Sequence, residues 1–449
     1  MFNKNYIVNK AILIYIIISF LGQTVNSYSD NDVYWKPLPE GVIKKIAFGS
    51  CSNQYIAQPI WKTLSTFKPD IFISLGDIIY GDAAPPGFRP LSAEINQIEK
   101  MKIDYLFVKT DPNFIEFRQK VPMMATWDDH DYGKNNGGAD FTLKDQSREL
   151  FLDFLGEPSG SEMRKTPGVY QSKIFGPAGK RVQVIILDTR YFRGPLLYSS
   201  MTYDEKIEKN IIGGYEPNKD TKVTMLGQVQ WKWLERQLKK PAEVRLLVSS
   251  IQVIAGEKGV ESWGNLPYER SRLYDLIDTT GAKGLIILSG DVHFAEISKT
   301  NEGPYPLYDF TSSPLAQYPY GMTGWEKYVN SYRISETYAN DNFGLVHINW
   351  EAEPSPLISL KVIGLQGAVI VEHKISLDEL QAGKITDKNP ITICPEQRPE
   401  ICTQDYRPVC AKQKDGSHKT YSNGCTACSD KNVVDYRNGS CVEEIILPY

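Results

Sequence analysis

Short apolar runs alternate with longer amphipathic segments from Lys44 to about Ile297. The runs are rich in Ile, Val and Leu, which is typical of buried strands in a mostly parallel sheet. The longer segments repeat apolar residues at helical spacing, and the alternation of the two predicts a layered α/β fold. We expect strands at Lys44–Gly49, Asp70–Leu75, Val121–Thr126, Arg181–Leu187, Val244–Ser249 and Gly284–Ser289, and helices at Leu143–Leu155, Gln228–Lys239 and Ser271–Thr279.

After Phe343 the apolar runs continue without helical segments between them. We expect these later strands to form a second sheet packed on the first, so the predicted fold class is α/β, a β-sandwich flanked by helices. Residues 381–391 are polar, contain Gly383 and Pro390, and are typical of a linker. The later strands are expected at Leu345–Trp350, Leu357–Gly364 and Ala368–Ile375.

Acidic residues come directly after three of the predicted strands. Asp77 and Asp129 follow the second and third strands, and Asp291 with His293 follows the strand that ends at Ser289. Ligands of parallel sheets bind beyond the carboxyl ends of the strands, so these side chains are expected at one rim. Crowded carboxylates repel one another unless cations neutralise them. The pattern therefore predicts a multinuclear metal site.

Two softer ligands accompany the carboxylates. Cys51 follows the first strand, and Tyr80 lies three residues after Asp77. A thiolate with a phenolate favours a trivalent metal, for which we predict ferric iron, whereas the carboxylates suit calcium or another divalent metal. Taken singly, each residue also has a structural interpretation. A cysteine at a strand end is commonly a small buried apolar group, and a tyrosine is commonly part of the core.

The chain has 449 residues, 41% of them hydrophobic, and a net charge of −4. It therefore lacks the excess of positive charge that is typical of nucleic-acid-binding proteins. Residues 1–27 combine Lys4 and Lys10 with the apolar run Ala11–Leu21, which predicts a secretory signal peptide. The alternative is a membrane anchor, but the run is short of the ~20 residues that span a bilayer. No later segment of the sequence is long and apolar enough to span a bilayer.

Seven cysteines occur, and six of them lie between Cys394 and Cys441. A dense, even set in a short tail predicts disulfides, and disulfides predict an oxidising compartment, so we expect a secreted protein or one in the lumen of the secretory pathway. Cys51 is left without a nearby partner. Such a cysteine is an intermolecular partner or a reactive or ligating thiol.

Five motifs follow strand ends in the order Gly49-Ser50-Cys51, Gly76-Asp77-Ile78-Ile79-Tyr80, Trp127-Asp128-Asp129-His130-Asp131, Leu187-Asp188-Thr189-Arg190 and Ser289-Gly290-Asp291-Val292-His293. In kind and order they resemble the alkaline phosphatase D (PhoD-like) metallophosphatases. The resemblance covers residues 44–375 of a catalytic domain expected at 28–380. The wider calcineurin-like phosphoesterases carry Asp-x-His where this chain has Cys51, and this departure favours the PhoD-like branch over a two-zinc site.

The resemblance implies the roles of the site residues. Asp77 would bridge two metals, and His130 would contact a substrate oxygen or the leaving group. Asn135 or Asn136 falls where the family has a metal-binding asparagine, and we take Asn136 for this role. The implied metal ligands are Cys51, Asp77, Tyr80, Asp129, Asn136, Asp291 and His293.

The implied reaction is hydrolysis of a phosphate monoester or diester by a metal-activated water. Asp77, His130 and Arg190 are the expected catalytic residues. Arg190 and Arg193 follow a strand end, where they either reach the phosphate in bidentate fashion or pair with carboxylates at the surface. The sequence does not decide between monoester and diester.

The last six cysteines, with the segments Cys402–Cys410 and Tyr421–Cys425, resemble a Kazal-type domain expected at residues 392–443. The resemblance implies a rigid protease-binding loop with Gln404 at the primary specificity position and Asp405 after it. A serine protease or another extracellular protein would then be the partner. The alternative for this domain is an interaction or spacer module without inhibition. The alternative function for the chain is an extracellular protease inhibitor or binding protein with a non-catalytic phosphatase scaffold. The implied disulfides are Cys394–Cys428, Cys402–Cys425 and Cys410–Cys441.

Overall fold

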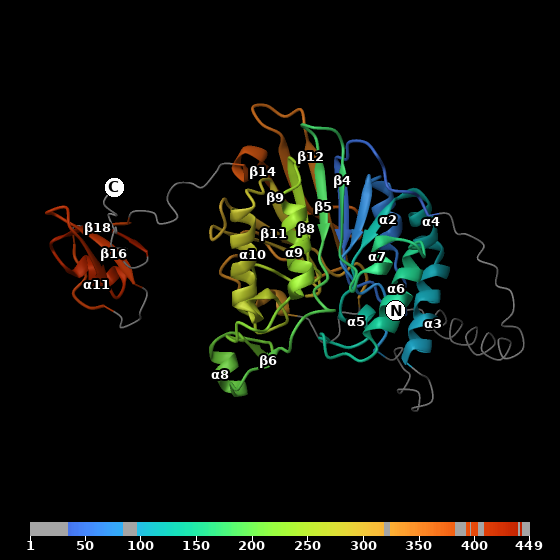
Figure 1. Cartoon of the computed structure of the whole chain (residues 1–449), viewed down its shortest axis with the longest axis horizontal. Helices are drawn as coiled ribbons and strands as arrows, with labels where there is room; N and C mark the ends of the chain where they lie inside the picture. The colour runs from blue at the N-terminus through green and yellow to red at the C-terminus, as the bar shows by residue number, and fades with distance from the viewer. Residues whose placement is uncertain are drawn as a thin grey trace, which may run out of the picture.

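The computed structural model describes residues 35–83, 97–317, 324–381, 392–395, 397–402, 408–438 and 441. Figure 1 shows two layers of strands side by side, with helices on their outer sides. The expected signal peptide at 1–27, nearly all of the expected linker, and Gln404 with Asp405 lie outside the described residues. Among the helices that are described, none has the length and apolar character needed to cross a bilayer.

The first sheet has the strand order β14-β13-β12-β1-β2-β3. β1 is parallel to β2, with Ala47 opposite Phe72, and antiparallel to β12, with Ala47 opposite Leu345. Parallel strands β1, β2 and β3 therefore end at one edge of the sheet. The strands are β1 (Lys45–Gly49), β2 (Ile71–Ser74), β3 (Met123–Ala125), β12 (Asn342–Asn349), β13 (Leu357–Gly364) and β14 (Val369–Ser376).

The second sheet has the order β10-β11-β9-β8-β5-β4. Strands β5, β8, β9 and β11 are parallel, and β4 and β10 are antiparallel strands at the two edges. The strands are β4 (Gln171–Phe175), β5 (Val182–Ile186), β8 (Val244–Val248), β9 (Leu285–Ser289), β10 (Glu296–Thr300) and β11 (Leu307–Thr311).

The expected assignment of strands to sheets is wrong, although each expected strand lies close to its predicted position; β4, β10 and β11 were not predicted. β12, β13 and β14 form no second sheet, because β12 pairs with β1 and extends the first one. The strands expected in one parallel sheet are divided between the two. Apolar side chains of both sheets fill the space between them, and the ring of Phe48 on β1 meets Phe310 on β11 edge to face at 4.9 Å.

Helices cover the outer faces of both sheets. Trp61 on α2 packs against Phe72 on β2 and Phe117 on α4, and Trp231 on α9 packs in the core of the second sheet. Local signals set helix ends: α4 begins at Pro112, after Asp111, whose carboxylate accepts hydrogen bonds from two backbone amides. The helices are α2 (Ile60–Thr66), α3 (Gln97–Thr110), α4 (Pro112–Lys120), α5 (Asp129–Tyr132), α6 (Lys144–Leu155), α7 (Glu162–Lys165), α8 (Tyr203–Glu208), α9 (Gly227–Leu238) and α10 (Pro267–Thr279).

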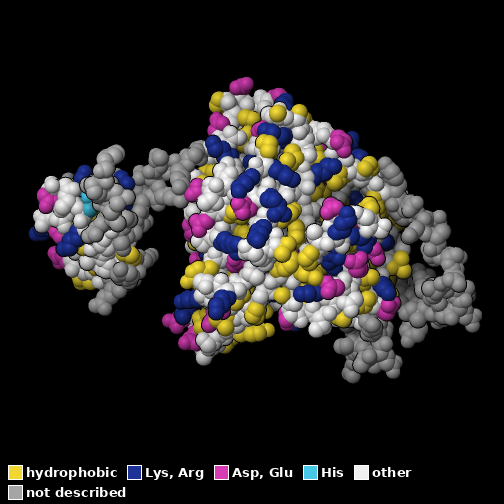
Figure 2. Space-filling view, in the orientation of Figure 1, with side chains coloured by type: hydrophobic (Ala, Val, Ile, Leu, Met, Phe, Trp, Pro, Cys, Tyr) yellow, Lys and Arg dark blue, Asp and Glu magenta, His cyan; other side chains and the backbone are white. Residues whose placement is uncertain are grey.

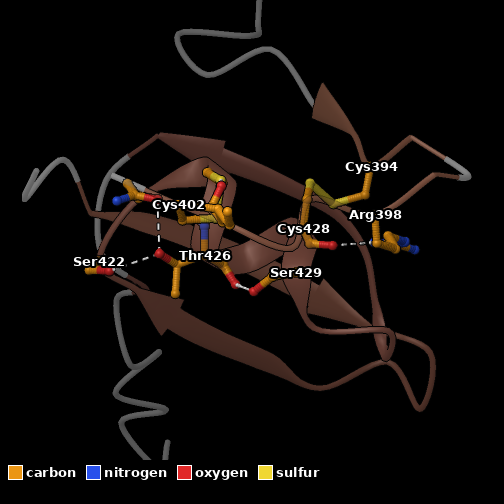
Figure 3. Close-up of a disulfide and its surroundings, with 10 residues drawn as sticks. Cys394, Arg398, Cys402, Ser422, Thr426, Cys428 and Ser429 are labelled. Atoms are coloured by element: carbon orange, nitrogen blue, oxygen red, sulfur yellow. Dashed lines mark hydrogen bonds between the residues drawn. A yellow bond between two sulfur atoms is a disulfide. The ribbon is translucent and has the colours of Figure 1, made fainter. Parts of the chain in front are cut away.

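The C-terminal region is a separate small domain with its own sheet, of order β15-β18-β16-β17, and one helix. Its core is built from a few apolar residues around Cys394 and Cys428, so disulfide bonds are needed to stabilise the domain (Figure 3). The structure forms the disulfides Cys394–Cys428, Cys402–Cys425 and Cys410–Cys441, the same pairs that the Kazal-type resemblance implies. The elements are β15 (Thr392–Ile393), β16 (Val409–Gln413), β17 (His418–Tyr421), α11 (Gly424–Ser429) and β18 (Val433–Asn438).

Candidate metal centre

Residues that follow strands of both sheets meet at one end of the sandwich. Cys51, Asp77 and His293 can each offer one ligand atom, and these atoms all lie within 4.8 Å of one another. The same holds for Asp77 with Asp129 and His130. It holds again for a third group, which is Asp77, Asp128, Asp129 and Asp291. Asp77 belongs to all three groups, which is the position that a bridging carboxylate requires.

The backbone at this rim is strained. Seven described residues other than glycine have positive φ, and five of them belong to the expected ligand set. Such conformations cost of the order of 1–3 kcal/mol each and persist where the surroundings impose them, commonly at functional sites. Gly76, with φ of 104°, is required here because a Cβ would lie 2.4 Å from the backbone nitrogen of Asp128. The five are Cys51, Asp77, Asn136, Asp291 and His293.

Cys51 is fully buried, and it is the one free cysteine that the described residues contain. Its Sγ lies 3.4 Å from Oδ2 of Asp77 and 3.7 Å from the backbone carbonyl of Asp291. Burial, followed by the negative charges of Asp77 and Asp291, holds the pKa of the Cys51 thiol well above its usual range. A thiolate at this position therefore needs a cation beside it.

The carboxylates are almost completely buried and are not fully satisfied by hydrogen bonds. Oδ2 of Asp129 accepts from the backbone amide of Asn136 at 2.7 Å, but Oδ1 is buried without a hydrogen-bond partner among the described residues. Burial, with Asp128 and Asp129, raises the pKa of Asp291 well above its usual range. Carboxylate oxygens that are crowded, buried and free of donors are the donor set that hard cations take, so the residues fit a bound metal.

Tyr80 and His293 lie together on the same side of this cluster. Oη of Tyr80 is 3.4 Å from Nε2 of His293, and Tyr80 is 4% exposed. Burial, and then the charge of His130, lowers the pKa of His293 to about 4, so its imidazole is neutral at physiological pH. Neutral imidazole is the form that binds metals.

His130 lies on α5 and is held by a carboxylate from the loop after β2. Its Nδ1 lies 2.6 Å from Oδ1 of Asp82, whose second oxygen accepts from the backbone amide of Asn135. Its ring lies 4.3 Å from that of Tyr80. Burial lowers the pKa of His130, but the carboxylates of Asp129, Asp77 and Asp82 outweigh burial and raise it well above the usual range. Sequence reasoning missed Asp82, although it closely follows the Gly76–Tyr80 motif.

Asp131 holds the loop that carries Asp77 in place. Its buried carboxylate accepts hydrogen bonds from the backbone amides of Asp77 (2.5 Å), Ile78 (2.9 Å), Ile79 (3.1 Å) and Asp128 (3.0 Å). One side chain thus ties the loop after β2 to the loop after β3. The positive φ of Asp77 is held by this cross-link.

Arg190 is fully buried rather than at the surface, where one of the sequence alternatives had it. Its Nε donates to Oδ1 of Asp128 at 2.7 Å, its Nη2 also donates to that oxygen, and its Nη1 donates to Glu261 at 2.5 Å. Arg193 lies 3.2 Å from Glu261 and donates to the backbone carbonyl of Asn136. All three nitrogens of Arg190 are engaged by carboxylates, an arrangement that favours a positioning role beside the cluster. No motif marked Glu261 in the sequence.

Asn136, and not Asn135, is the asparagine that borders the carboxylates. Its backbone amide donates to Asp129, and its side-chain Nδ2 donates to Oη of Tyr215 at 2.9 Å. Asn135 instead donates its backbone amide to Asp82. Asn136 is therefore the better placed of the two for the expected ligand role.

The fold and the carboxylate cluster define a phosphatase-type sandwich, and comparison with known proteins agrees. The PhoD-like phosphatase family matches residues 46–353. Alkaline phosphatase D of Bacillus subtilis (strain 168) is 24% identical over an alignment of 281 residues, which covers 55% of this chain and 45% of that protein. The chain thus matches less than half the length of this curated relative.

One solved structure shows the same fold. The structure of PhoD has a TM-score of 0.52 at 19% identity and covers 78% of this chain and 74% of its own, a likeness that shows the fold alone. The crystal structure of TT1561 of Thermus thermophilus has a TM-score of 0.32 at 10% identity, which is too low to support a shared fold. Because the family match spans more than half of the chain, the protein belongs to the PhoD-like phosphatase family.

Proposed function

We propose that this protein is a metal-dependent phosphoesterase that hydrolyses phosphate monoesters or diesters with a metal-activated water. The observation that carries the proposal is the position of Asp77 in three overlapping groups of ligand atoms. A carboxylate shared in this way is suited to bridge two cations. Family membership supports the reaction class, because PhoD-like phosphatases are hydrolases of phosphate esters.

The chain offers two kinds of ligand to the metals. Cys51, Tyr80 and His293 form the softer side, which suits ferric iron, and Asp129, Asn136 and Asp291 form the harder side, which suits calcium or another divalent metal. When bound, such metals polarise phosphoryl oxygens and lower the pKa of a coordinated water toward neutrality.

The remaining residues orient the substrate and hold protons. Asp82 accepts the Nδ1 proton of His130, which leaves Nε2 to donate a proton to the leaving-group oxygen. Arg190 fixes Asp128 behind the cluster, and Asp131 fixes the loop that carries Asp77. These contacts keep the side chains in place before substrate arrives.

The test is hydrolysis of 4-nitrophenyl phosphate and bis(4-nitrophenyl) phosphate, with metal analysis of the purified protein. We expect turnover of at least one ester, loss of turnover with a chelator, and its return with added metal. Asp77→Asn should lose both metal and turnover. Asp111→Asn is the matched control, because the carboxylate of Asp111 is also buried but accepts hydrogen bonds from the backbone amides of Asn113 and Phe114 at the start of α4. Turnover that survives complete metal removal would contradict the proposal.

We further propose that the protein is exported and that its C-terminal domain is a Kazal-like module for an extracellular protein. The three disulfides support both statements, because disulfides persist in oxidising compartments and their pairing matches the Kazal-type pattern. Inhibition of a protease panel by the full chain tests the partner. Inhibition without any ester hydrolysis would favour the alternative, a protease inhibitor or binding protein on a non-catalytic scaffold.

A further inference from the structure

Residues 195–221 form an ordered excursion beside the candidate metal centre. It contains a two-stranded hairpin of β6 (Leu197–Tyr198) and β7 (Tyr215–Glu216), with α8 between the two strands. Figure 1 places this excursion at the same end of the sandwich as α5, and Figure 2 shows hydrophobic side chains at its surface. Tyr198 is 76% exposed, and Leu197, Tyr203 and Ile207 are exposed as well.

The excursion contacts the centre on its carboxylate side through Tyr215. Oη of Tyr215 accepts a hydrogen bond from Nδ2 of Asn136 at 2.9 Å. The backbone amide of Asn136 in turn donates to Asp129 at 2.7 Å. Asn136 therefore links Tyr215 directly to the carboxylate cluster.

A second contact lies on the histidine side. Ile212 packs against a small apolar cluster that includes Val292 and Phe294, the two neighbours of His293. The backbone amides of Ile212 and Gly213 donate to the carbonyl of Lys258 at 3.1 and 2.8 Å, and that of Tyr215 donates to the carbonyl of Gly259 at 2.9 Å. These bonds fix the excursion against the centre from both sides.

Two tyrosine rings run outward from this junction. Tyr198 is directly opposite Tyr215 in the hairpin, and their ring centroids lie 5.2 Å apart at an interplanar angle of 41°. Tyr215 is half-buried against Asn136, whereas Tyr198 stands in solvent. The pair makes a continuous aromatic surface that begins beside the carboxylates and ends in solvent.

We propose that Tyr198 and Tyr215 form a subsite that binds a planar aromatic group esterified to the substrate phosphate. The inference rests on the proposed phosphoesterase function and adds a substrate class to it. Tyr215 contacts Asn136 at the border of the carboxylate cluster, so an aromatic ester group that extends from a bound phosphate on this side would meet the two rings. Aromatic rings pair at centroid distances of about 4.5–7 Å. The charges nearby are of both signs, with Asp204, Glu205, Lys206 and Lys209 on or next to α8, so the patch carries no basic attraction for an anionic membrane.

The test compares 1-naphthyl phosphate with n-butyl phosphate, each as the monoester and as the methyl diester. The measured quantity is the ratio of kcat/KM for the aryl ester to that for the alkyl ester. Tyr198→Ala should lower this ratio about threefold to tenfold, the range expected for one aromatic pair. Tyr198→Phe keeps the ring and should restore the ratio. Inhibition by the non-hydrolysable 1-naphthylmethyl phosphonate should weaken in Tyr198→Ala by a similar factor.

Tyr203→Ala is the matched control, because Tyr203 is 77% exposed on the same excursion but lies outside the ring pair. An unchanged ratio in Tyr198→Ala, or an equal fall in Tyr203→Ala, overturns the subsite. Loss of binding to phosphatidylcholine vesicles in Tyr198→Ala with an unchanged ratio would also overturn it and assign the patch to a membrane surface. In each of these cases the wild-type protein still hydrolyses esters. Failure of the wild type to hydrolyse any ester would instead overturn the proposed function itself.

Discussion

The imidazole of His130 is held by Asp82, whose carboxylate oxygen Oδ1 lies 2.6 Å from Nδ1 of the ring. The second oxygen of Asp82 is fixed in turn by the backbone amide of Asn135 at 2.7 Å. A carboxylate bound in this way sets both the orientation of the imidazole and the nitrogen that carries its proton. Asp82 is thus a positioning residue for His130, and it comes from a different loop.

Asp82→Asn should lower kcat about 10- to 100-fold, the usual effect of losing a carboxylate that supports a functional histidine. KM should change little, because Asp82 does not contact the proposed metal ligands directly. Steady-state kinetics separates the two constants, and metal content should stay at the wild-type level. Asp140→Asn is the control, since Asp140 is a more exposed carboxylate of the neighbouring loop and forms an ion pair with Lys134. Equal kcat values in the wild type and in Asp82→Asn would contradict the positioning role of Asp82.

Cys51→Ser should lower the iron content and the turnover together. Serine is a poor, mostly protonated ligand in place of a thiolate, and charge-transfer absorption from the thiolate should disappear with it. Metal analysis and the visible spectrum measure both effects, and thermal unfolding corrects for any loss of fold. A buried but non-ligating cysteine predicts the reverse: the variant keeps its metal and its turnover.

Arg190→Met should destabilise the fold by about 3–5 kcal/mol, because it leaves the buried carboxylate of Asp128 without its charged partner and leaves Glu261 with Arg193 alone. Chemical denaturation gives this free energy of unfolding. Lys239→Ala is the control, because Lys239 and Glu235 form a solvent-exposed pair whose loss should have no measurable effect. If Arg190 instead binds the phosphate directly, Arg190→Lys will raise KM strongly while the free energy of unfolding stays near that of the wild type.

Residues 392–443 should fold alone when oxidised and lose their structure when reduced. The domain has a small core, and removing one native disulfide from such a domain costs about 2–5 kcal/mol. Circular dichroism of the isolated fragment with and without reductant measures this. Truncation of the full chain at about Thr386 should leave ester hydrolysis intact, since every proposed ligand lies at or before His293. Loss of most activity on truncation would contradict the division into two domains.

Local patterns in the sequence predict most strands of the two large sheets, the residues at the ends of those strands and the cysteine framework. The run that became β9 is apolar throughout because a strand buried on both faces needs apolar side chains, and that pattern is local. Asp291 and His293 are recognisable because they interrupt such a run at its carboxyl end. The free state of Cys51 also follows from counting, as the other six cysteines cluster in the tail.

The pairing of the strands and the side chains that support the metal centre depend on contacts between residues far apart in the sequence. β12 joins β1 instead of forming a new sheet, and no local pattern encodes that choice, because backbone hydrogen bonds are alike in every strand and packing over long sequence distances selects the partner. Asp82 and Glu261 were missed for the same reason. A carboxylate in a loop has no periodicity, and its role is set by the His130 or Arg190 that folding brings beside it.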